Sequence, residues 1–256
     1  MQSSHPFKYS RYSENSRKVI PPGPVTRPKA VFLDAAGTLF KSTRPVAVSY
    51  AELARPYGKN VPSEEISRRF SHFFGTAPPM AFPGADGQRL EALEKAWWHE
   101  LVWRIFEPEG AFAGFDDYFD DLFAYFARSD SWVLYDDARA ALDALRARGL
   151  ILVMISNFDS RVLEIIRGLG IADYFDSVFI SSSAGFAKPD AEIFHLALER
   201  HHIAPDEALH VGDSPETDVE GALRAGVRPV LLDRDGDTRH DGAVRIGGLH
   251  ELMSLL

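Results

Sequence analysis

The chain of 256 residues contains no cysteine, which excludes disulfide bonds, thiolate metal sites and a cysteine nucleophile. No apolar run approaches the roughly 18–20 residues that a membrane-spanning helix needs, and no apolar segment typical of a secretory signal lies near the start. Basic residues are also fewer than acidic residues, because the chain has 28 Lys and Arg and 37 Asp and Glu, which gives a formal net charge of −9. We therefore expect a cytoplasmic protein with no membrane partner and no nucleic-acid partner, since nucleic-acid phosphates attract basic surfaces.

The residues that are present have the composition of a globular protein. Hydrophobic residues make up 45% of the chain and charged residues 25%, and the length suits one large domain or a domain with an insertion. Residues 1–28 differ from the rest because they are polar and carry four prolines after position 20. We expect this segment to be a disordered arm.

Short apolar runs recur along the chain, and amphipathic segments follow most of them. The runs cover residues 30–33, 151–155, 177–180, 209–211 and 229–232. The amphipathic segments cover residues 138–148, 161–169, 191–200 and 217–225. A glycine closes three of these four segments, as is typical of helix ends. Apolar strands that alternate with helices of about ten residues predict an α/β fold, with a parallel sheet and helices on both of its faces.

The alternation stops between residues 45 and 131, where the pattern is helical throughout. Four helical stretches are expected there, over residues 46–57, 63–74, 88–106 and 115–127. We predict that this stretch is an all-helical insertion that covers the C-terminal edge of the sheet. The core of the protein would then comprise residues 29–44 and 132–256, with residues 45–131 as the insertion.

Polar side chains follow four of the predicted strands. Asp34 comes directly after the run at 30–33, and Ser156 with Asn157 comes after the run at 151–155. Lys188 lies in the loop after the third run, and the sequence Gly-Asp-Ser-Pro-Glu-Thr-Asp at 212–218 follows the fourth. Because the carboxyl ends of parallel strands lie at one edge of a sheet, we expect these groups to converge on one crevice.

Together these side chains fit the transfer of a phosphoryl group, which needs a nucleophile, neutralised charge and donors for the equatorial oxygens. The carboxylate of Asp34 can attack phosphorus and form an acyl phosphate. Asp213 and Asp218 can hold Mg²⁺, which prefers oxygen ligands and would offset the repulsion between carboxylates and an anionic substrate. Ser156 can donate a hydrogen bond to a phosphoryl oxygen, and Lys188 brings positive charge to where negative charge develops.

The order of these motifs resembles the haloacid dehalogenase superfamily, a large group of mostly Mg²⁺-dependent phosphatases. The motifs are Asp-Ala-Ala-Gly-Thr-Leu at 34–39, Ile-Ser-Asn at 155–157, Lys-Pro-Asp at 188–190, and Gly-Asp at 212–213 with Asp218. The resemblance spans residues 29–256. It implies a Rossmann-like core, a small phosphorylated substrate, and a helical cap that closes over the site and selects the substrate.

The resemblance also assigns further roles at the site. The backbone carbonyl of Ala36 is expected to bind Mg²⁺ together with Asp34, Asp213 and Asp218. Asn157 is placed in the substrate-binding set with Ser156 and Lys188, where it orients the loop or presents its backbone N–H. The segment 156–159 and the tandem tryptophans at 97–98 are similar to a subgroup of uncharacterised hydrolases in this superfamily.

The sequence departs from the phosphatases of this family at Ala36. A second aspartate stands at that position in those enzymes, where it protonates the leaving oxygen and later activates water. Positioned acid–base catalysis contributes roughly 10²–10⁴-fold, so alanine should slow the hydrolysis of ordinary phosphate esters. The main hypothesis is a Mg²⁺-dependent phosphatase that is slow or that acts on a good leaving group, such as an acyl phosphate.

Three other functions and the oligomeric state stay open. Phosphonate hydrolases of the family also carry alanine here but use a cap lysine as a Schiff base, and the predicted cap holds only Lys59 and Lys95. The 2-haloacid dehalogenases of the family need no Mg²⁺ and lack the full acidic fourth motif, so Asp213 and Asp218 speak against them. The third is a catalytically weak protein that binds a phosphorylated ligand or a protein partner.

The remaining polar clusters have simpler interpretations. The histidines at 201–202 and the acidic pairs at 116–117 and 120–121 are expected to be solvated. Alternating aspartates at 233, 235 and 237 imitate half of a calcium loop but lack its final glutamate, so we expect a plain turn. The tryptophans at 97, 98 and 103 are expected in the core of the cap, with a face free to shape the pocket.

Overall fold

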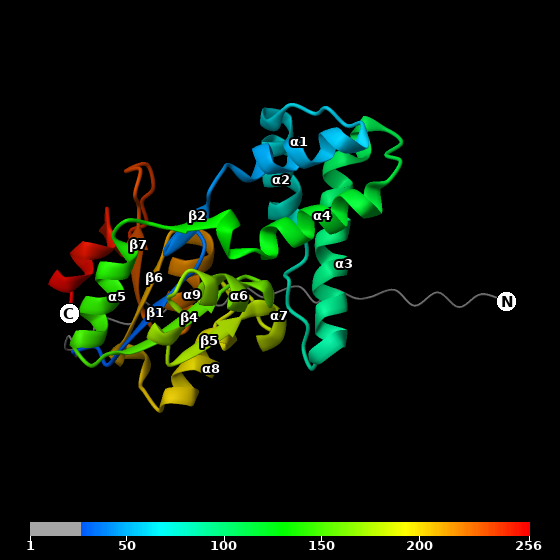
Figure 1. The fold of residues 1–256 in the computed structure, drawn as a ribbon. Coiled ribbons are helices and arrows are strands. Elements are labelled where there is room, and N and C mark those ends of the chain that lie inside the picture. The colour runs from blue at the N-terminus through cyan, green and yellow to red at the C-terminus, as the bar shows by residue number, and fades with distance from the viewer. Residues whose placement is uncertain (1–26) are drawn as a thin grey trace.

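The computed structural model describes residues 27–256 (Figure 1). The predicted disordered arm therefore lies, up to residue 26, outside the described residues. The strands are β1 Ala30–Leu33, β2 Phe40–Ser42, β3 Trp132–Leu134, β4 Ile151–Ser156, β5 Ser177–Ile180, β6 Ala208–Gly212, β7 Arg228–Leu232 and β8 Val244–Ile246. The α-helices are α1 Val46–Ala54, α2 Ser63–Thr76, α3 Gly87–Phe106, α4 Phe115–Ala127, α5 Ala138–Ala147, α6 Arg161–Gly168, α7 Ser181–Ala184, α8 Glu192–His201 and α9 Glu220–Arg224.

Six of the strands form one parallel sheet in the order β5-β4-β1-β6-β7-β8. The central strand is β1, where Leu33 pairs with Met154 of β4 on one side and with Val211 of β6 on the other. The chain goes from β1 to β4 on one side and reaches β6 on the other side only later, so the strand order reverses at β1. Open α/β sheets bind ligands at the C-terminal edge of such a switch point, and Asp34 follows β1 there.

Helices cover both faces of the sheet. One face, which includes Leu33 and Met154, packs against α5, α6 and the C-terminal turn Leu249–Ser254. The opposite face, which includes Phe32 and Val153, packs against α8 and α9. Neighbouring residues of a strand belong to different cores because successive side chains point to opposite sides of a sheet.

Helices α1–α4 stand together beyond one end of the sheet rather than on either of its faces (Figure 1). They pack around a hydrophobic core of their own, which includes Ile66 of α2, Leu101 and Ile105 of α3, and Tyr118 of α4. We call these four helices the helical insert. The insert buries its apolar faces within itself, so it adds to the sheet without interrupting it.

A short antiparallel pair joins the insert to the core. Strand β2 leads into the insert and β3 leads out of it, with Phe40 paired to Leu134 and Ser42 to Trp132. A single bridge between Ala36 and Phe40 ties this pair to the turn that follows Asp34. Both crossings between insert and core therefore lie beside the C-terminal edge of β1.

Helix α3 holds the insert against the core through one buried carboxylate. Glu94 accepts hydrogen bonds from the backbone N–H and the hydroxyl of Ser160, at 3.0 and 2.8 Å, and from the hydroxyl of Ser182, at 2.5 Å. Ser160 precedes α6, so the carboxylate lies at a helix N-terminus, where unpaired N–H groups and the helix dipole favour negative charge. Polar contacts thus join the insert to the core in addition to its two linkers.

The predicted fold class is confirmed, because the main sheet is parallel, both of its faces carry helices, and an all-helical segment follows β2. The exact division of the chain at residues 44 and 131 stays a prediction. Three short strands, β2, β3 and β8, were not predicted, since three residues are too few to show an alternating pattern. No helix among the described residues is both long enough and apolar enough to span a membrane.

The segment predicted as one helix at 217–225 is divided in two. A π-helical turn, Pro215–Val219, comes first and α9 follows it. The hydroxyl of Ser214 accepts a hydrogen bond from the N–H of Thr217 (3.2 Å), while the N–H of Ser214 donates to the Asp218 carboxylate (3.0 Å). The wider turn directs the carboxylate of Asp218 back toward the end of β6, where it accepts from the N–H of Ser214.

Candidate active site

The site is built around Asp34, the first residue after β1. Its N–H donates to the carbonyl of Val211 at 2.9 Å, which extends the ladder between β1 and β6 by one residue. The chain then turns at Gly37, whose φ of +91° favours glycine, and a Cβ there would lie 2.4 Å from the carboxylate of Asp213. Glycine is therefore required both by the backbone conformation and by the close approach of the second acid.

Lys188 is buried between two carboxylates. Its Nζ lies 2.7 Å from Oδ1 of Asp34 and 2.6 Å from Oδ1 of Asp218. Asn157 fixes the loop that carries the lysine, because its side-chain amide donates to the Lys188 carbonyl and accepts from the Lys188 N–H, both at 2.8 Å. The Asn157 amide thus orients Lys188, which is one of the two roles expected of it from the sequence.

Asp218 is held from several sides. Its Oδ1 contacts Nε2 of His210 at 3.0 Å as well as Lys188, and its Oδ2 accepts from the N–H of Ser214 at 3.0 Å. A Cβ at Gly212 would lie 2.1 Å from the Asp218 Cγ, so only glycine leaves room for this carboxylate. Burial opposes its ionisation, but the Lys188 ammonium and the His210 hydrogen bond hold the pKa of the Asp218 carboxyl below its usual range.

Asp213 is the more exposed of the two acids after β6 and accepts a hydrogen bond from the hydroxyl of Thr38 at 3.1 Å. Burial by its neighbours, followed by repulsion from the carboxylates of Asp34 and Asp218, raises the pKa of Asp213 to about 6. The pKa of Asp34 is raised for the same two reasons, against the opposing charge of Lys188. Negative charge at the site therefore exceeds what one lysine balances.

The donor set suits a divalent cation. Oxygens of Asp34, Asp213 and Asp218 lie within 4.8 Å of one another. Three carboxylates and one ammonium carry a formal charge of −2, which a cation such as Mg²⁺ would cancel. Among the described residues, no donor is bonded to the carbonyl oxygen of Ala36, so this oxygen is also available as a ligand. Carboxylate and carbonyl oxygens are the ligands that Mg²⁺ prefers.

Ser156 ends β4, beside β1, and its side chain is buried at the same edge of the sheet. Its hydroxyl has no hydrogen-bond partner among the described residues and lines the same cavity as Asp34 and Lys188. The expectation that the four strand ends converge is therefore confirmed. The roles assigned to these side chains, as nucleophile, metal ligands and phosphate donors, stay predictions.

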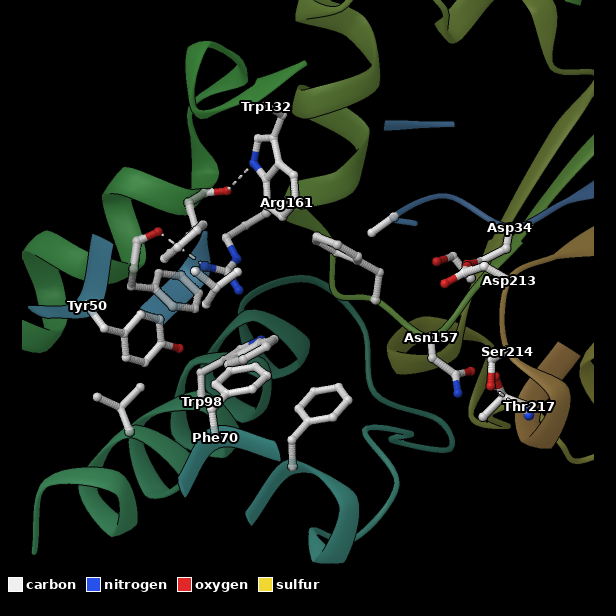
Figure 2. A pocket seen from close by; sticks show the side chains of 18 of the residues that line it. Asp34, Tyr50, Phe70, Trp98, Trp132, Asn157, Arg161, Asp213, Ser214 and Thr217 are labelled. Carbon is white, nitrogen blue, oxygen red and sulfur yellow. Dashed lines mark hydrogen bonds between the residues drawn. The ribbon is translucent and has the colours of Figure 1, made fainter. Parts of the chain in front are cut away.

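The four strand ends form one wall of a cavity of about 370 Å³, and the helical insert forms the opposite wall. Figure 2 shows Asp34, Asp213 and Asn157 on one side of this space, with Tyr50, Phe70 and Trp98 facing them from the other. Sites for small molecules in proteins have volumes of this order, about 300–1,000 Å³. The predicted crevice is therefore a pocket between core and insert.

A polar network on the wall opposite Asp34 was missed by the sequence analysis. Asp159 is fully buried and pairs with Arg161, at 2.8 Å to Nε and 2.7 Å to Nη2, while Nε1 of Trp98 donates to it at 2.6 Å. The sequence held one signal of this network, because the acid and the arginine follow the Ser-Asn motif.

The remaining clusters lie away from the cavity. His201 contacts the Ser177 hydroxyl through Nε2 at 2.7 Å. Asp233 caps a turn by accepting from the N–H groups of Gly236, Asp237 and Thr238, as expected of a plain turn. The acidic face of α4 is exposed at residues 116, 117, 120 and 121. Of the tryptophans at 97, 98 and 103, only Trp98 lines the cavity.

The fold and the site together define a class of protein, a Rossmann-like α/β core with an aspartate at a sheet switch point and a helical insert over it. The family model of haloacid dehalogenase-like hydrolases matches residues 28–226. The chain therefore belongs to the haloacid dehalogenase-like hydrolases.

Individual proteins agree with this assignment. The haloacid dehalogenase-like hydrolase domain-containing protein 3 of Bos taurus is 33% identical over 202 residues, which cover 78% of this chain and 79% of that protein. A phosphoserine phosphatase of Thermus thermophilus is 39% identical over 134 residues, 51% of this chain and 54% of that protein. The crystal structure of a HAD phosphatase from Thermococcus onnurineus has a TM-score of 0.62 at 25% identity, covering 89% of this chain and 97% of that one.

Proposed function

We propose that this hydrolase is a Mg²⁺-dependent phosphatase that acts on a small phosphorylated molecule through a phosphorylated Asp34. The observation that carries the proposal is the meeting of three carboxylates and one buried ammonium at the C-terminal edge of β1. The identity shared with a phosphoserine phosphatase over half of the chain supports the same reaction class. A cytoplasmic location and a small-molecule substrate belong to the same proposal.

Two displacements at phosphorus make up the reaction. In the first, a carboxylate oxygen of Asp34 attacks phosphorus, and the leaving oxygen departs with the bonding electron pair and takes a proton from water. In the second, water attacks the phosphorus of the aspartyl phosphate, the Asp34 carboxylate departs, phosphate is released and a proton passes to solvent. Lys188 and Ser156 bind the equatorial oxygens in both steps.

The ion would be held by Asp34, Asp213 and the carbonyl of Ala36, with Asp218 as the further ligand expected from the sequence. When bound, Mg²⁺ supplies positive charge that lets an anionic substrate approach the carboxylates. Because Oδ1 of Asp218 already contacts Lys188 and His210, its Oδ2 is the oxygen with capacity for one more partner. The main task of Asp218 in this arrangement is to hold Lys188 against Asp34.

Among the residues that the structure describes, no other side chain in the cavity replaces the acid that Ala36 lacks. Among the described lining residues, the only carboxylic acids are the three of the site, and none is a histidine. Tyr50 also lines the cavity, but burial raises the pKa of its phenol far above the usual value, so it is a poor proton donor. The leaving group must therefore depart without a proton from the protein, which favours acyl phosphates and other good leaving groups.

The three alternative functions left open by the sequence are supported to different degrees. Lys59 donates to the carbonyls of Glu109 and Gly110 and Lys95 pairs with Asp120, and neither lines the cavity, so a phosphonate hydrolase would lack its amine. A 2-haloacid dehalogenase needs no cluster of three carboxylates, which here lie within 4.8 Å of one another. A binding protein without turnover is the alternative that an activity assay separates.

The test is a substrate panel of acetyl phosphate, phenyl phosphate, phosphoserine and 2-chloropropionate, each assayed with Mg²⁺ and with chelator. We expect phosphate release from acetyl phosphate and phenyl phosphate that stops with chelator and in Asp34→Asn. Acid-quenched wild-type protein should carry one phosphoryl group at Asp34, which mass spectrometry of its peptides detects. Release of chloride without Mg²⁺, or no turnover above Asp34→Asn for any substrate, would overturn the proposal.

A further inference from the structure

The wall of the cavity that faces Asp34 is almost entirely apolar. Nine aromatic side chains of residues 27–256 line the cavity, and Val46, Val102 and Leu122 of the insert complete its apolar surface. Figure 2 shows the rings of Tyr50 and Trp98 directed into the space opposite Asp34. All polar groups that could hold a phosphoryl group lie on the other wall, so the body of the substrate, beyond its phosphate, must contact rings and aliphatic side chains.

Among the described residues that line the cavity, the one cationic side chain away from the carboxylates is already neutralised. Arg161 lies against Asp159, and the pair carries no net charge. All three guanidinium nitrogens donate to protein acceptors, since Nη1 bonds to the Phe123 carbonyl at 3.2 Å and the other two bond to Asp159. The guanidinium also lies 3.8 Å from the centre of the Phe123 ring. A second anionic group on a substrate would therefore meet no free cation from the described part of the chain on this wall.

One polar atom on the apolar wall has capacity for a ligand. The side chain of Tyr50 is buried, and its hydroxyl has no hydrogen-bond partner among the described residues. Figure 2 shows this hydroxyl directed into the pocket. A single hydrogen bond at the far end of the substrate body is compatible with the site, whereas several hydroxyls would leave most of them without partners.

The chemistry of the polar wall favours the same compounds. Because no acid stands at position 36, the leaving oxygen must be stable as an anion, and phenolates and carboxylates meet this requirement better than alkoxides. A phenol supplies both a leaving oxygen that is stable as an anion and a flat apolar body. The turn after β1 and the helical insert lie in different parts of the chain. Both favour a phosphorylated compound with an aromatic body.

We propose that the substrate is a phosphate ester or acyl phosphate whose body, beyond the phosphate and the leaving oxygen, is uncharged, apolar and preferably aromatic. The inference rests on the proposed phosphatase function and narrows it to a substrate class. It excludes phosphoserine and sugar phosphates as good substrates, because their charged or hydroxylated bodies would be buried against rings. It makes the apolar lining of the insert, rather than a charged group, the determinant of specificity.

The decisive comparison keeps the leaving oxygen constant and varies the body. Phenyl phosphate, 2-naphthyl phosphate and phosphotyrosine all release a phenolate, but the last carries an ammonium and a carboxylate. We expect kcat/KM to rise about tenfold from phenyl to 2-naphthyl phosphate. This is well below the upper limit of about 250-fold that four added carbons would give at about fourfold each, because the packing of the second ring is imperfect. We expect it to fall at least about tenfold from phenyl phosphate to phosphotyrosine.

The outcomes separate this inference from the function on which it rests. If phosphotyrosine is hydrolysed as fast as 2-naphthyl phosphate, the substrate class is wrong and the phosphatase function stands. If neither acetyl phosphate nor any other phosphorylated compound is hydrolysed in a Mg²⁺-dependent way, the proposed function itself is wrong. Acetyl phosphate serves as the reference, because its small body makes little contact with the apolar wall.

Two variants test the walls directly. Leu122→Trp should fill the cavity and raise the ratio of KM for 2-naphthyl phosphate to KM for acetyl phosphate about tenfold. Leu163→Trp on the exposed face of α6 is the matched control and should leave this ratio unchanged. Asp159→Asn removes the negative charge that neutralises Arg161 and should raise kcat/KM for phosphotyrosine relative to phenyl phosphate. Retained acetyl phosphate turnover shows that each variant is folded, and unchanged ratios in folded variants would overturn the inference.

Discussion

Replacing Glu94 by alanine tests the contact that holds the insert on the core. The carboxylate accepts three hydrogen bonds in a buried place, two from Ser160 and one from Ser182. Hydrogen bonds to a charged group contribute about 1.5–3 kcal/mol each, and they are not additive because the two hydroxyls can turn to other acceptors. We expect Glu94→Ala to lower the free energy of unfolding by about 3 kcal/mol. For a chain of this size that is a fall in Tm of about 6–12 °C.

Thermal unfolding followed by circular dichroism measures this change. The matched control is Glu91→Ala on the same helix, where the side chain is exposed and the expected change is within about 0.5 kcal/mol. Glu94→Gln keeps the volume and an acceptor but loses the charge, so it should fall between the two. Hydrogen exchange at the first amides of α6 should also accelerate in Glu94→Ala. If Glu94→Ala and Glu91→Ala unfold within about 1 kcal/mol of each other, the contact does not stabilise the interface.

Three further substitutions test the site itself. Ala36→Asp restores a proton donor and should raise kcat for alkyl phosphates by up to about 10²-fold, with little change for acetyl phosphate. Gly212→Ala places a Cβ 2.1 Å from the Asp218 Cγ, so it should weaken Mg²⁺ binding measured by calorimetry and destabilise the fold by about 2 kcal/mol. His210→Phe keeps a ring against Phe194 but removes the hydrogen bond to Asp218, and should lower kcat about tenfold.

Each of these substitutions has a matched control. Ala36→Asn has the shape of the aspartate without its proton, so an equal gain in Ala36→Asn would contradict the missing-acid explanation. Gly75→Ala adds a methyl group where no atom lies within 4 Å, and it should not affect Mg²⁺ binding. His210→Gln retains a donor toward Asp218 and should recover part of the activity. Equal losses in His210→Phe and His210→Gln would mean that the ring, not the hydrogen bond, matters.

The meeting of the site residues could be predicted because sheet geometry alone determines it. Parallel strands place their carboxyl ends at one edge, so residues that follow strands 30–33, 151–155 and 209–211 had to come together whatever the side chains do. In the structure, the glycines at 37 and 212 leave room for the carboxylates of Asp213 and Asp218. The chemistry then followed from residue types, because three acids and a lysine in one place have few other uses.

The opposite wall could not be predicted for an equally physical reason. Whether Arg161 offers a free charge depends on its pairing with Asp159, and this pairing depends on side-chain torsions rather than on strand order. Glu94 reaches Ser182 across 88 positions in the sequence, and no periodicity encodes that distance. The direction in which helices of the insert present their rings depends on how α1–α4 pack, which the amphipathic patterns leave undetermined.

The missing acid should affect the rate of the chemical step, whereas the apolar wall should affect how tightly the substrate is bound. The residue at position 36 determines how strongly the rate depends on the basicity of the leaving oxygen, while Leu122 and its neighbours determine how tightly the body is bound. Ala36→Asp should therefore flatten the dependence of kcat on leaving-group pKa and leave the preference for 2-naphthyl over phenyl phosphate intact. Leu122→Trp should do the reverse, and the free-energy effects of the two substitutions on kcat/KM should add to within about 0.5 kcal/mol in the double variant. A larger deviation would mean that the leaving oxygen and the substrate body do not interact with separate walls of the cavity. That result would refute the assignment of one requirement to each wall.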